Sequence, residues 1–342
     1  MRTFFSLLVL WCMSAVVMTT PAAGAYRLIQ TISVAGDEGW DHPTIDSAAR
    51  RLYVTHGTHV VVIDIESGKL VGKIDDTPGV HFTVIDPELG RGFISNGGAA
   101  GRLTIFDTKT LATIGQVATG GENPGPTVFV PARKRIFTFN LNTHNAAVVD
   151  AKEGHVVGSF ELGGRPELVG ADAHGSVFVN LVEKNVVLQI DSHKMTVGQT
   201  WSVGPCQGPR TMAVDQQNRR LFVGCANRRM IVLDSQSGRI IDSGQSAQVR
   251  MIPLTIRRHG SYIFPTAMAR FPSSSRKTRT LTTLSKTVKT ALGARNMALD
   301  PKTKRIFLPL FDRRAPPPAT AAASNRPGDV IPGTFRVLVF GK

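Results

Sequence analysis

Short runs of apolar residues, separated by polar turns, recur along most of this chain at nearly constant spacing. Five of these runs are rich in valine, isoleucine and leucine and end in an aspartate, with steps of 43, 43, 41 and 43 residues between Asp64, Asp107, Asp150, Asp191 and Asp234. Runs of this length, rich in β-branched residues and bounded by turn-forming residues, predict β-strands rather than helices. A fixed period along the chain indicates a repeat architecture.

One period contains the pattern of four strands. In the first period a short strand ends at Asp46, a second covers residues 51–55, a third covers residues 60–64, and a fourth covers residues 70–74. Four short strands joined by tight turns form an antiparallel meander, which at this period is typical of a propeller blade. We therefore predict an all-β fold, a seven-bladed β-propeller whose blades begin near residues 42, 81, 126, 166, 209, 252 and 296.

The two ends of the repeat predict how the ring closes. Residues 26–34 have the pattern of a fourth strand with no first three strands before it, and residues 335–340 have the pattern of a third strand with no fourth after it. A linear array would leave both edges open to pairing with other chains. We expect the N-terminal strand to complete the last blade, so that residues 26–342 form a single β-propeller domain.

Residues 1–25 carry the features of a secretory signal peptide. Arg2 supplies a positive charge, residues 4–18 are apolar, and Ala23-Gly24-Ala25 matches a small-residue cleavage site. No second apolar run of about 18 residues follows, which is the length that a membrane-spanning helix needs. We expect cleavage near Ala25 and a periplasmic or secreted protein, with an uncleaved membrane anchor as the alternative.

Cleavage would leave two cysteines, Cys206 and Cys225, because Cys12 lies in the signal peptide. Two thiols in an oxidising compartment predict one disulfide. Cys206 precedes the first strand of the fifth predicted blade and Cys225 ends the second strand, and antiparallel neighbours bring those two ends together. This arrangement allows the Cα separation of about 4.4–6.8 Å that a disulfide requires. Two free buried thiols are the alternative.

The second strands carry a motif that resembles a known family. Residues 52–56 read Leu-Tyr-Val-Thr-His and resemble the signature of the YVTN-family β-propeller repeat proteins, with His56 in place of the final asparagine. Residues 93–97, 137–140 and 178–180 are similar variants, and the resemblance covers residues 26–243 and 289–342. It implies an exported, bacterial-type propeller fold. It implies no activity, because many members have no assigned reaction and a fold does not carry function.

Residues 245–288 lack this repeat. They hold eight lysines and arginines and no aspartate or glutamate. If each codon is read from its last base plus the first two bases of the next, residues 251–252 give aspartate and residues 268–269 give glycine, and a blade-like pattern returns. We hypothesise a frameshifted sixth blade, with one insertion or deletion near codon 244 and a compensating one near codon 287. The alternative is a genuine basic loop that binds an acidic partner or nucleic acid.

This hypothesis changes the interpretation of the charge. The chain has 40 basic and 25 acidic residues, a net charge of +15, and removal of the eight charges above and Arg2 leaves 15 − 8 − 1 = +6. A charge of this size is weak evidence for nucleic-acid binding.

Residues 313–333 are rich in proline and alanine, and we expect them to form a loop between two strands of the last blade.

The loops that lead into the first strands of the blades are the candidate site. In a propeller these loops converge at one end of the central channel, and convergent polar groups in a concavity are the default binding site. The alternative is that these residues simply solvate the channel mouth. The candidate ligand-binding residues are Asp41, His42, His81, Glu122, Asn123, Arg165, Glu167, Arg210, Arg295 and Asn296.

A metal is a further possibility at this site. His42 and His81 occupy equivalent positions in adjacent blades, and with Asp41 or Glu122 they could form a histidine–carboxylate metal site. Histidines in loops are more often simply exposed. We predict no other cofactor.

The sequence contains no motif of a known catalytic class in a supporting context. We therefore expect an exported, monomeric binding scaffold that holds a small molecule or a protein partner at the channel face, with no reaction assigned. One alternative is a channel-site enzyme of the lactonase or quinoprotein-dehydrogenase-related type. A third interpretation is nucleic-acid binding.

Overall fold

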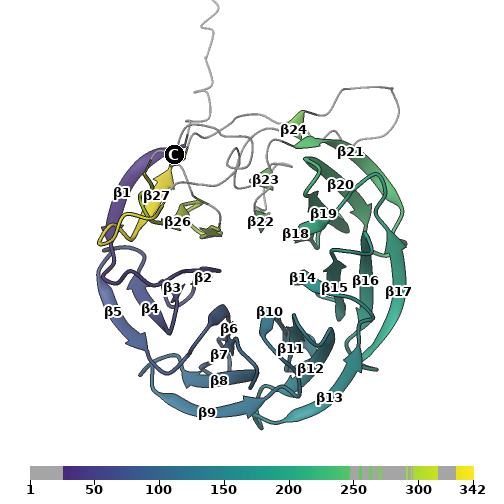
Figure 1. Cartoon of the computed structure of the whole chain (residues 1–342), viewed down its shortest axis with the longest axis horizontal. Coiled ribbons are helices and arrows are strands. Elements are labelled where there is room, and N and C mark those ends of the chain that lie inside the picture. Colours follow the sequence, from purple (N-terminus) through teal and green to yellow (C-terminus); the bar gives the residue numbers. More distant parts are fainter. Residues whose placement is uncertain are drawn as a thin grey trace, which may run out of the picture.

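The computed structural model describes residues 26–246, 254–255, 262–263, 269–270, 290–291, 294, 296–314 and 329–342. Within these residues, six antiparallel four-stranded blades are arranged around one axis (Figure 1). The fold is therefore an all-β propeller, as the sequence predicts. No described helix is long and apolar enough to cross a membrane.

The first three blades follow one another along the chain with the strands in sequence order. The first blade consists of β2 (Thr44–Asp46), β3 (Arg51–His56), β4 (His59–Asp64) and β5 (Leu70–Ile74). The second consists of β6 (Val80–Asp86), β7 (Arg91–Asn96), β8 (Arg102–Asp107) and β9 (Thr113–Ala118). The third consists of β10 (Pro124–Val130), the short 3₁₀ helix η1 (Pro131–Arg133), β11 (Arg135–Asn140), β12 (Asn145–Asp150) and β13 (Val156–Glu161).

The fourth and fifth blades repeat this order. The fourth consists of β14 (Pro166–Ala171), β15 (Ser176–Leu181), β16 (Val186–Asp191) and β17 (Thr196–Ser202). The fifth consists of β18 (Pro209–Asp215), β19 (Arg220–Cys225), β20 (Arg229–Asp234) and β21 (Ile240–Ser246). In each blade the first strand lies nearest the axis and the fourth lies at the rim (Figure 1).

The last blade is completed by the N-terminal strand. It contains β25 (Ala298–Leu299), β26 (Ile306–Leu310) and β27 (Arg336–Gly341), and β1 (Arg27–Ser33) pairs antiparallel with β27 at its outer edge. The expected mode of closure is therefore confirmed. Because the first and last segments share one sheet, β27 is paired on both sides and is not left as an open outer edge.

The prediction of seven blades is wrong, because the described residues form six. Between β21 and β25 they show only a two-stranded sheet, β22 (Leu254–Thr255) with β23 (Tyr262–Ile263), and a short strand β24 (Ala269–Arg270) that pairs with β21. The printed residues here lack aspartate-ended strands and carry eight unbalanced positive charges, so they do not encode four alternating strands. Most of residues 245–288, and with them the frame hypothesis, lie outside the described residues.

The periodic aspartates end the third strand of the first five blades by turn chemistry. Asp64 Oδ1 accepts hydrogen bonds from the backbone N–H groups of Glu66 and Ser67, at 3.2 and 2.7 Å. The same arrangement recurs at Asp107, Asp150, Asp191 and Asp234. The hydrogen bonds from Ser67 lower the pKa of Asp64. The sequence period therefore reflects repeated aspartate turns, in which a side chain mimics a backbone turn.

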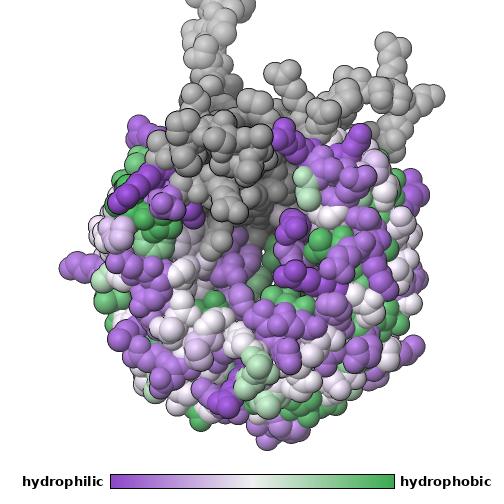
Figure 2. Space-filling model, viewed as in Figure 1, coloured by the Kyte–Doolittle hydropathy of each residue, from purple (hydrophilic) through white to green (hydrophobic). Residues whose placement is uncertain are grey.

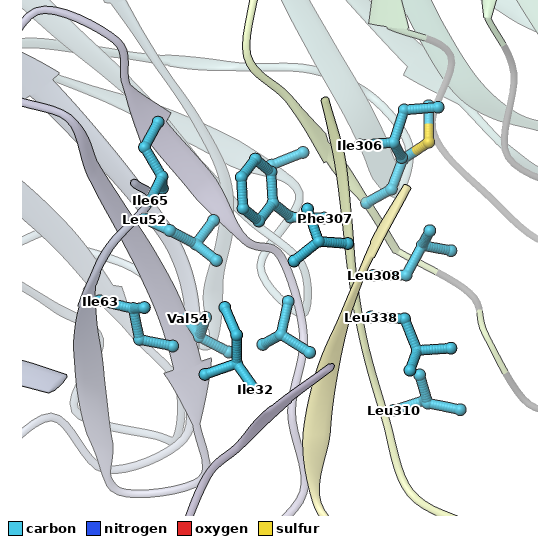
Figure 3. Close-up of a cluster of buried hydrophobic side chains, with 14 of the residues drawn as sticks. Ile32, Leu52, Val54, Ile63, Ile65, Ile306, Phe307, Leu308, Leu310 and Leu338 are labelled. Atoms are coloured by element: carbon cyan, nitrogen blue, oxygen red, sulfur yellow. The ribbon is translucent and has the colours of Figure 1, made fainter. Parts of the chain in front are cut away.

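The ring closes on a shared hydrophobic core. Leu52 and Ile63 of the first blade pack in one cluster with Ile32 of β1 and with Phe307 and Leu338 of the last blade, as Figure 3 shows. All five side chains are buried. Because burial of apolar surface is the main favourable term in folding, this cluster holds the first and last blades together.

Candidate functional site

The innermost strands share an irregularity at the channel mouth, the end of the channel at which these strands begin. In four consecutive blades, the first strand holds one residue more than the facing stretch of the second strand, near the start of the first strand. One extra residue on the first strand is the definition of a β-bulge, a feature found beside many active sites because it changes the direction of a side chain. The shifts lie between Val80 and Thr83, Pro124 and Thr127, Pro166 and Val169, and Pro209 and Thr211.

Three of the candidate residues lie in these bulges. They are His81 in β6, Glu167 in β14 and Arg210 in β18. In the third blade the bulge holds Gly125 and Pro126 instead. The structure thus brings ionisable side chains from the second, fourth and fifth blades to one end of the channel. On the face shown in Figure 2, hydrophilic residues lie around the axis, interspersed with hydrophobic ones.

His81 lies between two hydrogen-bond acceptors. Its Nδ1 atom is 2.8 Å from Asp41 Oδ2, and its Nε2 atom is 3.0 Å from Asn123 Oδ1. Since both oxygens accept, both ring nitrogens donate, which is the hydrogen-bonding pattern of the protonated imidazolium. Burial lowers the pKa of His81, but the hydrogen bond and charge of Asp41 and the contact with Asn123 outweigh it and raise the pKa above its ordinary value.

Asp41 is the centre of this polar group. Its Oδ1 atom accepts a hydrogen bond from Asn296 Nδ2 at 2.9 Å and lies 3.2 Å from His42 Nε2. Its backbone N–H donates to Thr55 Oγ1 at 3.0 Å. The contacts of Asp41 with Asn296, His81 and Thr55 tie the last blade, the second blade and the first blade together at the mouth.

Both histidines are engaged with other side chains. The His42 ring stacks on the ring of Phe82, with centroids 3.9 Å apart, and both nitrogens of His81 already face Asp41 and Asn123. Among the described residues, no group of three or more histidine, cysteine, aspartate or glutamate side chains could hold a metal ion.

A second polar group lies on the fourth and fifth blades. Arg210 Nη1 is 3.6 Å from Glu167 Oε1, and these side chains are 51% and 27% exposed. Burial raises the pKa of Glu167, the charges of Arg210 and Arg165 act in the opposite direction, and the charge of Asp41 adds to the rise, so that the pKa ends above its ordinary value.

The remaining candidates divide into three cases. Arg165 is exposed and makes no side-chain hydrogen bond or ion pair within the described part of the chain. Glu122 is exposed and joins neither polar group; its backbone N–H donates to Thr143 Oγ1. Arg295 lies outside the described residues, whereas its neighbour Asn296 is buried against Asp41.

The predicted disulfide is confirmed. Cys206 and Cys225 are bonded, their Cα atoms are 5.5 Å apart, and both are buried. Pro209, at the start of β18, is the pairing partner of Cys225. The disulfide therefore fixes the loop that leads directly to Arg210.

Sequence reasoning missed the hydroxyl groups that hold the mouth in place. Thr55 Oγ1 accepts the N–H of Asp41, and Ser95 Oγ accepts the N–H of Phe82 at 3.0 Å and donates to the carbonyl of Gly125 at 2.8 Å. Thr55 directly precedes His56 and Ser95 directly precedes Asn96, which are equivalent positions of two YVTN-like segments. That shared position is the signal that could have identified them.

Comparison with known proteins supports the fold. No protein-family model matches the sequence. The chain is 26% identical over 148 residues to the uncharacterized protein YncE of Salmonella typhimurium, and the match covers 41% of this chain and 41% of that protein, so the chain spans about two fifths of this relative's length. A chain in the crystal structure of the mitotic checkpoint complex aligns over 98% of this chain and 99% of its own length, with 11% identity and a TM-score of 0.67. These likenesses support a β-propeller and leave the YVTN family unconfirmed.

Proposed function

We propose that this protein is an exported binding scaffold that holds a ligand or a protein partner at the channel mouth. The observation that carries the proposal is the repeated bulge at the start of the inner strands. A bulge interrupts the strand ladder and leaves a residue unpaired. Its recurrence in four blades therefore indicates a functional feature rather than an irregularity of one blade. Three of the four bulges direct an ionisable side chain, His81, Glu167 or Arg210, to the same end of the channel.

The neighbouring hydrogen bonds support this proposal because they fix these side chains before any ligand arrives. His81 is held from both sides by Asp41 and Asn123, and Asp41 is held in turn by Asn296. Binding to groups that are already ordered costs less conformational entropy than binding to mobile ones. The propeller fold and the weak likeness to YncE are consistent with a scaffold of this kind.

Export is the second part of the proposal. The bond between Cys206 and Cys225 fits an oxidising compartment, where structural disulfides form and persist. Residues 1–25, the proposed signal peptide, lie outside the described residues. Cell fractionation followed by N-terminal sequencing tests this directly. We expect a mature protein that begins near Tyr26 in the exported fraction, and an intact N-terminus in the cytosol would contradict export.

A ligand screen tests binding at the mouth. We would screen small polar molecules for thermal stabilisation of the mature protein, and repeat each hit with His81→Gln and with His174→Gln. His174 is exposed in the turn between β14 and β15, at the opposite end of the channel, and serves as the matched control. We expect ligands whose thermal stabilisation of the protein is smaller in His81→Gln and unchanged in His174→Gln. Hits that are equally strong in both variants, or a stoichiometric metal in the purified protein, would favour another site or the channel-enzyme alternative.

A further inference from the structure

The channel-mouth loops of the fourth and fifth blades form one continuous surface. The backbone N–H of Gly208 donates to Asn185 Oδ1 at 2.7 Å, and the N–H of Val203 donates to the carbonyl of Asn185 at 3.1 Å. The N–H of Val182 donates to the carbonyl of Arg165 at 3.3 Å. These bonds join residues 182–185 to the loops that begin β14 and β18, which lie side by side in Figure 1.

Basic side chains gather on this surface. Arg165, Lys184 and Arg210 are all exposed. The aliphatic part of Lys184 lies against Gly164, and its Nζ atom would lie 3.5 Å from a Cβ atom at Gly163. Lys184 therefore lies beside the two residues that precede Arg165. Positive charges grouped at a channel mouth raise the local concentration of anions.

The carboxylates nearby do not satisfy these cations. Glu183 is exposed on the same loop as Lys184, and Glu167 lies 3.6 Å from Arg210 Nη1. Charge-assisted hydrogen bonds between a guanidinium and a carboxylate are about 2.7–2.9 Å long. The observed separation is longer, so the donors of Arg210 remain available. A guanidinium presents a planar fork of N–H donors that matches two oxygens of a carboxylate or phosphate.

The opposite half of the mouth has the reverse charge. Its loops, which belong to the first three blades, carry the acidic residues Asp37, Glu38, Asp41, Asp75, Asp76 and Glu122, and these outnumber the cations Lys73, His81 and Arg102 at the same end. An anion that approaches the mouth is therefore repelled from this half and attracted to the basic half. The charge distribution consequently fixes the orientation of any ligand with a charged group.

We propose that the basic half of the mouth binds a small anion, with Arg165 and Arg210 holding its carboxylate or phosphate group and Lys184 adding charge. This inference rests on the proposed function and names the class of ligand. Glu167 lies 3.6 Å from Arg210 Nη1 and competes with the ligand for Arg210. Protonation of Glu167 removes that competition, so anion binding strengthens as the pH falls through the raised pKa of Glu167. The charges that act on Glu167 are those of Arg210, Arg165 and Asp41, and Lys184 and Glu183 lie on the adjoining loop.

The test is calorimetric titration of the mature protein with sulfate and with succinate at constant ionic strength. Sulfate serves as the phosphate-like probe because its charge is constant near neutral pH, and succinate is the carboxylate probe. We expect Arg210→Gln and Arg165→Gln each to weaken binding of the preferred anion about tenfold, which corresponds to the loss of one charge-assisted contact. The matched control is Arg133→Gln, an exposed arginine at the opposite end of the channel, and it should leave binding unchanged. Glu167→Gln should tighten binding and remove its dependence on pH.

The outcomes separate this inference from the proposed function. If neutral or cationic ligands bind in a manner that depends on His81 while neither anion binds, the scaffold proposal stands and the anion site is wrong. Equal weakening in Arg133→Gln and Arg210→Gln would also overturn it, because binding would then follow net charge alone. Binding of a single-stranded oligonucleotide without either small anion would likewise overturn it. Circular dichroism of each variant confirms that the fold is retained.

Discussion

Arg50 of the first blade and Asp300 of the last blade form an ion pair, with Nη1 and Oδ2 2.8 Å apart. Asp300 is fully buried, and Arg50 is 15% exposed and also contacts Glu66. Ser47 and Thr303 donate further hydrogen bonds to the same carboxylate. The contact lies across the join where the ring closes, so it couples closure to the stability of both blades.

Removal of the arginine should destabilise the protein. Arg50→Met leaves the buried Asp300 carboxylate without its cation, which costs about 3 kcal/mol of unfolding free energy. Urea unfolding of the mature protein measures this loss. The control is Arg102→Gln, which breaks an exposed contact with Gln116 within a single blade and should change stability by about 0.5 kcal/mol or less. Equal effects of the two substitutions would contradict a role for the pair in closure.

Acid should destabilise the closed ring through Asp300. Burial raises the pKa of Asp300, but the hydrogen bonds from Ser47, Thr303 and Arg50 outweigh burial and hold the pKa far below its ordinary value. A depressed pKa means that the stabilisation is present above the unfolded-state pKa of about 3.9 and is lost as the pH falls below it. Unfolding titrations at a series of pH values should show this loss. The Asp300→Asn variant should be less stable at neutral pH, and its unfolding free energy should vary less with pH in acid. An acid profile identical to that of the wild type would count against Asp300 as the cause.

The parts of the fold that the sequence predicts correctly are those set by local chemistry. The aspartate turns depend on residues two and three positions apart, so Asp64 and its counterparts mark the period without any knowledge of the fold. The pairing of β1 with β27 follows from counting strands, and the disulfide follows from antiparallel neighbours. The seventh blade fails because the count assumes that every period encodes four strands, and residues 245–288 as printed do not.

The candidate site was harder to predict because its geometry depends on register. The residues at the mouth follow from the repeat, but the extra residue on the inner strand depends on pairing with the second strand. The sequence therefore names His81, Glu167 and Arg210 without the bulges that direct them. The separation of the mouth into two polar groups depends on side-chain contacts across blades.

The frame hypothesis stays a prediction, and nucleotide sequencing across codons 240–290 tests it.

His56 should give the protein a second, milder acid response. Its side chain is fully buried and stacks on Phe335 of the last blade, with centroids 4.3 Å apart. Burial lowers the pKa of His56, as does His59, while Glu38 acts in the opposite direction. A lowered histidine pKa means that the unfolded chain takes up a proton first, so stability falls as the pH drops below about 6.5. In His56→Phe the unfolding free energy should vary less between about pH 5 and 7 than in the wild type. An unchanged slope would assign the response to another group.

The disulfide should contribute to stability and to the mouth. It closes a loop with a sequence separation of 19 residues, and a loop of that length is worth about 3 kcal/mol in the chain-entropy description. The double variant Cys206→Ser/Cys225→Ser should therefore unfold at lower urea concentration. Because Cys225 pairs with Pro209 beside Arg210, binding of ligands that depend on Arg210 should weaken too. Unchanged stability in the double variant, with the wild-type bond verified by non-reducing mass spectrometry, would contradict this prediction.

Arginines at the start of the second strands should differ in importance according to the blade that follows them. Arg91 donates across the blade boundary to the carbonyls of Ala151, at 3.2 Å, and Lys152. Arg220, at the equivalent position of the fifth blade, instead donates to carbonyls of its own blade, those of Asn218 at 2.9 Å and Arg219 at 3.1 Å.

Because hydrogen bonds from a charged group contribute about 1.5–3 kcal/mol, Arg91→Met should lower the unfolding free energy by about that amount. Arg220→Met removes contacts that hold no neighbouring blade, together with a pairing to Asp234 at 3.4 Å, and should cost about 1 kcal/mol or less. Urea unfolding of the two variants side by side measures the difference. If Arg220→Met proves as costly as Arg91→Met, then these arginines stabilise their own strands and the bonds between blades are incidental.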